Sequence, residues 1–544
     1  MSIRTAADIG SVRPVPLRAA RGAFAACLLA VFLQMLDMTV VNTALPTLAR
    51  DLAATGSAQL FVVTGYSLAF ACALPTATRL GDIHGRRTLF LASMAGFIMA
   101  SIWCGCCEQS TALIGGRMVQ GIAAAGMAAQ TVAIVNASFA PDRRALAFGI
   151  YGAVAGSAGL AGPLVGGAIV ATDPLGLGWH AIFLLNAPVG VLALILAYRG
   201  LHIGASPTST RADIPGVLLA SVGLLLVLYP VTVGRERGWP AAILVMLGVG
   251  CLVLVVFGWQ QYRAEGTGLL RGAIFTDRTF AVGAIAMLVF YGVFTAFLFT
   301  VSATMQSGIG LSAWQTATFM TPFALGAIPA AATAPLLVAR LGSRTLTVGI
   351  LVFAVSAAVI ASLLHHSSAG VEARVLAAPI CLAGIGIGWF AAALPALMTA
   401  RVTDSEVGSA SGLLPTIQQL GSAFGAAALG TVFFARISDG DGIAAGESAF
   451  ARALMERGIP LERTLAEVGR FDTCAHAALA SPTPMVDGST CPATIPDVGI
   501  DAAAVTMAQT YIAALSTLMS IMAAIAFALG MLTLLMPRDA GSRA

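Results

Sequence analysis

The sequence predicts an all-α membrane protein with fourteen spanning helices. Fourteen apolar stretches run through its 544 residues, each of them near or above the roughly 20 residues that a helix needs to cross a bilayer. Hydrophobic residues make up 58% of the chain and charged residues only 10%, whereas about a quarter of the residues of a soluble domain are charged. The mean hydropathy of +0.89 agrees with a chain that belongs in lipid.

The expected spans fall into three groups. The first six cover 23–45, 58–78, 88–107, 112–137, 145–171 and 180–200. The next two cover 214–233 and 240–260, and the last six cover 279–304, 313–339, 345–364, 375–399, 407–435 and 507–536. We therefore expect six-helix units at 23–200 and 279–536, a two-helix insert at 214–260, and tails at 1–22 and 537–544.

The one large segment outside these spans is 437–506, which falls within the second six-helix unit. Acidic and basic residues at helical spacing predict a surface helix over 447–470, and a stretch rich in Pro, Ser and Thr at 481–497 predicts an irregular loop. Cys474 and Cys491 are the only cysteines of this segment. If the segment lies outside the cell, a disulfide between them would persist; the alternative is a mobile loop with two free thiols.

The distribution of arginine predicts the orientation in the membrane. The chain has no lysine, and with the N-terminus inside, the cytoplasmic segments hold nineteen arginines against four in the short outside loops, at Arg50, Arg235, Arg237 and Arg374. Short cytoplasmic loops carry an excess of basic residues, while long loops translocate regardless of charge. Both termini are therefore expected in the cytoplasm, and the first span should remain as an anchor in the plasma membrane.

Asp37 is the only acidic residue within a predicted span. An ionised carboxylate at that depth is costly, so an acid there is a hypothesis of function by default. Gln34, Asp37 and Val41 share one helical face by their spacing. The alternative is a buried acid that is hydrogen-bonded to a neighbouring helix for structure alone.

Three further segments carry unusual residues. Thr78–Arg87 combines a Gly81-Asp82 turn with the paired arginines Arg86 and Arg87. A plain cytoplasmic loop would explain the arginines but not the turn. Arg117 lies inside the fourth span and should face the protein interior and find a carboxylate, a carbonyl or a water; a purely structural tie between helices is the alternative. The fifth span carries a glycine-rich face with the run Gly162–Gly167, which combines close helix contact with a possible proline kink.

These motifs together resemble the major facilitator superfamily, and specifically its fourteen-helix drug:proton antiporters. The matching segments are 37–46, 82–87, 116–121, 156–167, 179–190 and 408–425, and the resemblance extends from about residue 24 to residue 536. Thr78 and Ile83 depart from the family's loop motif, and the corresponding loop of the second half, Arg340–Arg344, lacks its aspartate. Symmetric gating of the two halves is therefore not implied.

The resemblance implies two six-helix bundles that rock about a central cavity, with the two inserted helices at the periphery. It implies that Asp37 and Arg117 couple transport to protons, and that a cationic substrate gains from pairing with Asp37. The expected gating residues are Asp82, Gly85, Arg86, Arg87, Gly162, Pro163, Gly166 and Gly167, with Asp82 meeting the helix start near 406–411. The expected substrate-binding residues are Gln34, Tyr66, Tyr151, Asn186, Tyr291, Gln306, Trp389 and Gln418.

The function implied is proton-coupled efflux of lipophilic, cationic or neutral drugs across a bacterial plasma membrane. Export of an endogenous secondary metabolite or lipid, and symport of a metabolite, are the alternatives within transport. The sequence contains no HExxH, GxSxG, paired acids or nucleotide loop, so neither an enzyme nor a metal site is expected. The expected partners are lipid, protons and a small substrate, with no cofactor, no nucleic acid and a monomeric chain.

A reporter fusion tests the orientation. An enzyme that is active only outside the cytoplasm, fused after Ala544, should be inactive because the arginine bias holds the C-terminus inside. The same reporter inserted near Asp441 should be active. Activity of the Ala544 fusion would reverse the predicted topology.

Overall fold

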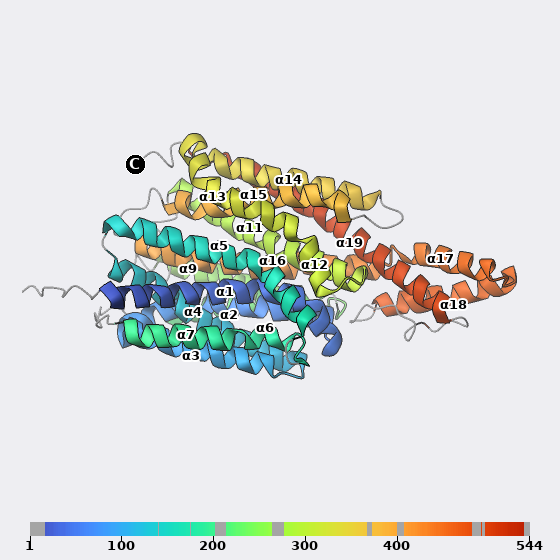
Figure 1. The fold of residues 1–544 in the computed structure, drawn as a ribbon, viewed down its shortest axis with the longest axis horizontal. Helices are drawn as coiled ribbons and strands as arrows, with labels where there is room; N and C mark the ends of the chain where they lie inside the picture. Colours follow the sequence, from blue (N-terminus) through green and yellow to red (C-terminus); the bar gives the residue numbers. More distant parts are fainter. Residues whose placement is uncertain are drawn as a thin grey trace, which may run out of the picture.

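The computed structural model describes residues 17–139, 141–173, 176–201, 214–234, 236–263, 277–366, 373–399, 407–480, 491 and 496–537. Within these ranges the regular structure is helical throughout (Figure 1). Thirteen helices are long and apolar enough to span a membrane. A fourteenth follows if α5, which bends by 42° between Ile150–Gly159 and Ala161–Thr172, is counted as one span. The predicted all-α fold with fourteen spans is confirmed.

The first six spans are built from seven helices. These are α1 (Leu17–Asp51), α2 (Gly56–His84), α3 (Arg86–Gly105), α4 (Ser110–Ser138), α5 (Pro141–Thr172), α6 (His180–Leu184) and α7 (Asn186–Gly200). Thr55 caps α2 by accepting a hydrogen bond from Ala58 N at 3.1 Å. Gly85, with φ +91°, separates α2 from α3, since a left-handed backbone ends a helix at little cost only at glycine. The first six spans form the N-terminal bundle.

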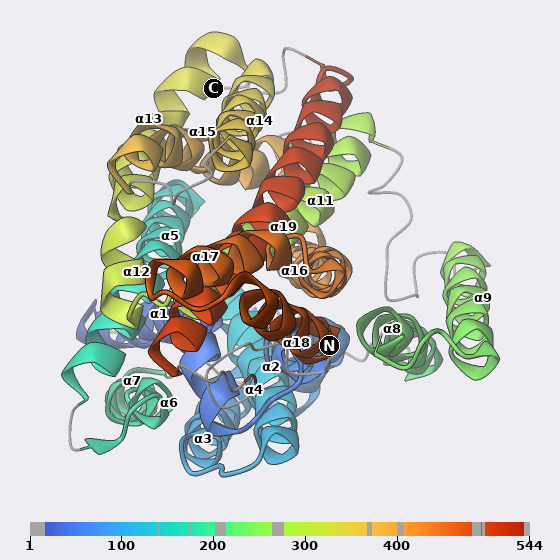
Figure 2. The same ribbon diagram turned by 90° about the vertical axis from the view of Figure 1, so that its right-hand side faces the viewer.

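The insert consists of α8 (Ile214–Val233) and α9 (Ala241–Arg263). α8 packs against α2 and α16, whereas α9 packs on α8 at the outer edge of the molecule (Figure 2). The carboxylate of Glu236, between the two helices, accepts hydrogen bonds from the backbone nitrogen and the hydroxyl of Ser57 at 2.7 and 2.6 Å. This contact ties the insert to the start of α2.

The last six spans are built from α11 (Arg278–Ala303), η2 (Thr304–Gly308), α12 (Ala313–Phe319), α13 (Thr321–Leu341), α14 (Arg344–His365), α15 (Ala373–Thr399), α16 (Val407–Asp439) and α19 (Pro496–Thr533). Asp277 caps α11, and Ser312 with Gln315 forms a capping box at α12. The element η2 is a π-helical turn that continues α11. These spans form the C-terminal bundle.

The two bundles meet along α2 with α16 and along α5 with α12 (Figure 2). We call this boundary the seam. Near one end of it, Leu60 of α2 packs on Gly430, and Phe434 of α16 packs on Gly56. α1 also reaches across the seam to α11.

The helices α17 (Ile443–Glu456) and α18 (Leu461–Ala480) project from one end of the molecule (Figure 1). We call this end the α17–α18 end; α1 begins and α19 ends at the opposite end. The prediction of one surface helix over 447–470 is wrong, because Gly458, with φ +76°, and Pro460 break it into two. α19 begins eleven residues before the predicted 507, and its 38 residues span about 57 Å, well beyond a hydrocarbon core of about 30 Å. Its first turns therefore pack with α17 outside the bundle.

The structure joins Cys474 and Cys491 in a disulfide with a Cα separation of 5.7 Å. Phe450 of α17 packs on Phe471 of α18 at 5.4 Å, so this hairpin has a small apolar core of its own. The bond fastens α18 to the chain just before α19.

Removing the disulfide should destabilise the α17–α18 hairpin. Cys474→Ser should cost up to about 3 kcal/mol, because an open 17-residue loop gains entropy in the unfolded state. Thermal unfolding with and without reductant measures this, and Cys251→Ser, at an exposed cysteine of α9, is the matched control. Two thiols open to alkylation without reductant would contradict the bond.

Candidate functional site

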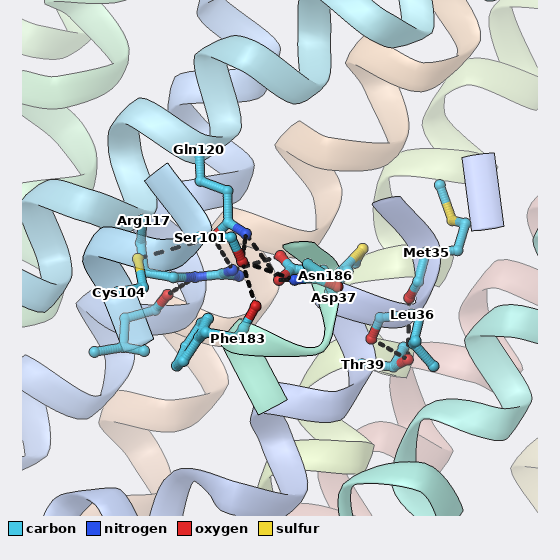
Figure 3. Close-up of polar contacts among 12 residues, drawn as sticks. Met35, Leu36, Asp37, Thr39, Ser101, Cys104, Arg117, Gln120, Phe183 and Asn186 are labelled. Atoms are coloured by element: carbon cyan, nitrogen blue, oxygen red, sulfur yellow. Dashed lines mark hydrogen bonds and ion pairs between the residues drawn. The ribbon is translucent and has the colours of Figure 1, made fainter. Parts of the chain in front are cut away.

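Asp37 of α1 lies completely buried in the N-terminal bundle (Figure 3). Its carboxylate accepts hydrogen bonds from three side chains. Arg117 Nη1 lies 2.5 Å from Oδ2, and the amide nitrogens of Gln120 and Asn186 lie 2.9 and 2.8 Å from Oδ1. The two charged side chains are 0% and 1% exposed, so this is an ion pair fully removed from solvent.

The Arg117 guanidinium has further partners that do not depend on the carboxylate. Its Nε donates to the Val62 carbonyl at 3.2 Å, and Nη1 also donates to Gln120 Oε1 at 2.8 Å. The guanidinium carbon lies 4.4 Å from the centre of the Tyr66 ring and 5.8 Å from that of Phe183. Aromatic faces stabilise a desolvated cation. The positive charge is therefore held from several sides.

A second layer of polar groups fixes the two amides. Ser101 Oγ accepts from Gln120 Nε2 at 3.2 Å and from Asn186 Nδ2 at 2.9 Å, and it donates to the Phe183 carbonyl at 2.8 Å (Figure 3). We call Asp37, Ser101, Arg117, Gln120 and Asn186 the Asp37 cluster. A buried polar network is stable when its members are satisfied, and this one links α1, α3, α4 and α7.

The local sequence explains how the helices come close enough. Arg117 and Gln120 lie three residues apart and therefore share one face of α4. A side chain at Gly116 would collide with Cys104 of α3, and one at Gly121 would collide with the Tyr66 carbonyl of α2. The two glycines that flank the arginine motif thus let α4 approach both neighbours. Asn186 begins α7, directly after Leu185, which separates it from α6.

The residues that follow Asp37 face away from the cluster, toward the seam. Gln419 Nε2 of α16 lies 3.7 Å from Met38 Sδ. A side chain at Gly162 of α5 would collide with Thr39. The carboxylate therefore belongs to the interior of one bundle, while its chain neighbours contact α5 and the other bundle.

Two small hollows lie on the seam between α1, α5, α11, α12 and α13. Each has a volume of about 10 Å³, about the room of one water molecule. Pro163, Leu298 and Met320 line both, and Asn42 and Thr316 line the first. Asn42 Oδ1 and Thr316 Oγ1 have no hydrogen-bond partner among the described residues. We call these two spaces the seam hollows.

The predicted gating residues at the α2–α3 turn contact their own bundle. Arg86 Nη1 donates to the Ala133 carbonyl of α4 at 3.3 Å, and Arg87 Nη2 donates to the Tyr198 carbonyl of α7 at 2.9 Å. Gly85 forms the turn between α2 and α3. The Asp82 side chain, and those near 406–411 that it was expected to meet, lie outside the described residues, so that contact stays a prediction.

The predicted gating residues of α5 divide between two neighbours. Gly162 and Gly166 pack against Thr39 and Val40 of α1, whereas Gly167 packs against Ala313 and Ala317 of α12. Pro163 lines both seam hollows. The motif therefore joins α1 to the C-terminal bundle through close backbone contact.

The eight predicted substrate-binding residues do not form one group. Tyr66 lies over the Arg117 guanidinium and Asn186 donates to the Asp37 carboxylate, and their contact with a substrate stays a prediction. Gln306 lies at the seam, bonded to the Thr43 carbonyl. Gln34 is buried in α1, and Tyr151, Tyr291 and Gln418 are half-buried. Trp389 donates to Thr333 Oγ1 at 3.1 Å within the C-terminal bundle.

Sequence reasoning did not assign a role to Gln120, Ser101 or Ser302. The three-residue spacing from Arg117 could have found Gln120. Ser101 and Ser302 sit in apolar helices without a polar pattern around them, so nothing in the sequence singled them out. Gln419 was passed over for its neighbour Gln418, because a helix with little amphipathicity does not show which of two adjacent residues faces inward.

Comparison with known proteins agrees with this architecture. A model of the Major Facilitator Superfamily matches residues 27–426. The chain is 33% identical over 425 residues to a protein of Streptomyces coelicolor described as a probable actinorhodin transporter, covering 77% of this chain and 74% of that protein. It is 34% identical to the puromycin resistance protein pur8 of Streptomyces alboniger, covering 74% and 80%. It is also 34% identical to the cephamycin export protein CmcT of Amycolatopsis lactamdurans, covering 74% and 82%.

Among solved structures, the chain resembles a bacterial homologue of the human lysosomal transporter Spinster in an inward-facing, unoccupied conformation. The TM-score is 0.59 at 15% identity, and the match covers 95% of this chain and 98% of that one. At this identity the likeness shows the fold alone.

A double-mutant cycle tests the ion pair. Arg117→Leu should destabilise the protein by about 3–5 kcal/mol, because it leaves the Asp37 carboxylate buried and unpaired. The double variant Asp37→Asn, Arg117→Leu should recover much of this loss, since it buries no net charge. Unfolding in detergent gives the coupling energy.

The control for this cycle is Arg436→Leu, which removes an exposed ion pair with Asp439 and should cost about 1 kcal/mol or less. Additive losses at Asp37 and Arg117 would show that the two charges do not stabilise one another.

Proposed function

Because the chain belongs to the major facilitator superfamily, whose model matches residues 27–426, we propose that it exports small lipophilic molecules from a bacterial cell in exchange for protons. The observation that carries the proposal is the Asp37–Arg117 pair, an ion pair removed from solvent inside a membrane bundle. Acids at this depth are rare and mark proton relays and substrate pathways. The curated relatives described as exporters and resistance proteins support transport outward.

The proposed orientation places the α17–α18 end outside the cell. A disulfide joins residues of this end, and disulfides persist in oxidising compartments. The arginine bias of the loops supports the same direction. In this orientation the seam contacts at Leu60, Gly430 and Phe434 lie on the outer half of the molecule, where they pack the two bundles together.

Proton exchange at Asp37 would act on the ion pair directly. A proton on the carboxyl removes the negative charge, yet Arg117 keeps the Val62 carbonyl, Gln120 Oε1 and the Tyr66 ring as partners. The cation can therefore remain buried while the acid is neutral. With no solvent contact at Asp37, proton entry requires the helices around it to separate, which couples protonation to the motion of α1.

The substrate would not contact Asp37 itself. Both carboxylate oxygens are occupied from within the bundle, and the seam hollows are lined by uncharged side chains such as Asn42, Thr316 and Phe323. A charged substrate would find no buried partner there. We therefore replace direct pairing of a cation with Asp37 by indirect competition, in which neutral lipophiles bind at the seam when the carboxyl is ionised.

Export of a self-made antibiotic is a second candidate. Relatives are described as a probable actinorhodin transporter and a cephamycin export protein. Both candidates share one transport mechanism and differ only in the source of the substrate. Efflux of a chemically diverse panel of aromatic antibiotics and dyes would distinguish either of them from a metabolite symporter.

Neutralising the acid tests the coupling. Asp37→Asn keeps the size of the side chain and one acceptor oxygen but cannot bind and release a proton, so gradient-driven efflux and substrate-induced proton release from reconstituted vesicles should both fall to background. Asp439→Asn, at an exposed acid of α16, should transport at the parental rate. Undiminished proton release by Asp37→Asn would place the carrier residue elsewhere.

A further inference from the structure

α1 contains a proline, Pro46, within its continuous span. Proline has no backbone N–H, so the carbonyl four residues earlier loses its donor within the helix, and the ring also pushes that carbonyl aside. In α1 this carbonyl belongs to Asn42. A buried carbonyl without a donor costs free energy, so a partner from outside the helix is expected.

That partner comes from the other bundle. Ser302 Oγ of α11 donates to the Asn42 carbonyl at 2.7 Å. Gln306 Nε2, one turn further along, donates to the adjacent Thr43 carbonyl at 2.7 Å and to Ser302 Oγ at 3.0 Å. Ser302 and Gln306 are 6% and 3% exposed, so water does not compete for these bonds.

Gln306 reaches α1 from an unusual backbone. It lies in the π-helical turn η2, where Ile309 N donates to the Thr304 carbonyl at 2.9 Å. Gly308 of the same turn packs so closely on Tyr511 of α19 that a side chain there would collide with the ring. Single π-turns inside helices are rare overall, and those that occur are often found at functional sites.

We propose that Pro46, Ser302 and Gln306 form a latch that holds the two bundles together on the outer half of the seam. Its acceptors are two backbone carbonyls of α1, one of which is available because of the proline. The proposal rests on the proposed function in two respects: the latch must open during each transport cycle, and the α17–α18 end must face the outside of the cell. Ser302 also lines the first seam hollow, where Asn42 Oδ1 and Thr316 Oγ1 have no hydrogen-bond partner among the described residues, so a first water admitted there finds polar groups to bind.

The proposal predicts which changes matter. Ser302→Ala and Gln306→Leu each remove a donor, and Pro46→Ala supplies an N–H that competes for the Asn42 carbonyl. Each should raise the ratio of outward-open to outward-closed protein about 2- to 10-fold, the value of one ordinary hydrogen bond. Ser302→Thr keeps the hydroxyl and should behave as the parent.

Labelling of a single cysteine measures this ratio. Leu298, which lines both seam hollows, is changed to cysteine in a chain whose seven free cysteines are replaced and whose disulfide is kept. A membrane-impermeant sulfonated maleimide is added to intact cells. The labelling rate at Leu298→Cys should rise with each latch variant and stay at the parental value with Ser302→Thr.

The matched control is Pro335→Ala, which removes an exposed proline from the interior of α13 and should leave the rate unchanged. Ser302→Ala deletes one atom and tests the same bond if Pro46→Ala fails to reach the membrane. Parental labelling of Ser302→Ala together with Gln306→Leu would overturn the latch.

This measurement needs no substrate and no proton gradient. If the latch variants label at the parental rate while Asp37→Asn still abolishes proton release, the latch is rejected and the proposed function stands. Faster labelling of the latch variants in a protein that moves no protons would support the latch and reject proton coupling.

Discussion

The ion pair between Asp37 and Arg117 is the constraint on which the N-terminal bundle depends. The Asp37 carboxylate cannot be buried without Arg117 at less than a large penalty, so α1 and α4 must stay in register, and the remaining hydrogen-bonding positions must be filled. Gln120 and Asn186 occupy the second carboxylate oxygen, and Ser101 fixes both amides. The small residues around Arg117 follow from the same need, because the guanidinium reaches its partners only where the helix backbones nearly touch.

The pair also sets what a change of charge can do. The guanidinium keeps a carbonyl, an amide oxygen and an aromatic face as partners when the acid is neutral. The carboxylate, in contrast, has Arg117 as its charged partner. Protonating Asp37 is therefore easier than separating an ionised Asp37 from Arg117, because the only charge then left in the site, that of Arg117, still has other partners. α1, which carries the acid, also contacts both α5 and α11.

Much of this arrangement could be predicted from the sequence, and the exceptions share a cause. The spans follow from apolar length, and Asp37 and Arg117 were found because charges are rare in such helices. Side-chain direction was harder: Tyr66 was expected at the central cavity but lies over Arg117 in its own bundle. Helices that are apolar all round carry little information on which face is inside. Ser302 and Gln306 matter through backbone carbonyls of another helix, which no pattern of side chains reveals.

α1 combines these roles within two turns. Asp37 points into the N-terminal bundle, Met38 and Thr39 meet α16 and α5, and the carbonyls of Asn42 and Thr43 accept from α11. Five residues separate the acid from the first of these carbonyls, about 7.5 Å along the axis. A rotation or shift of α1 by a fraction of a turn therefore cannot alter the ion pair without moving the acceptors that, in our proposal, hold the outer seam. In the proposed mechanism, protonation and gating are linked because both act on α1.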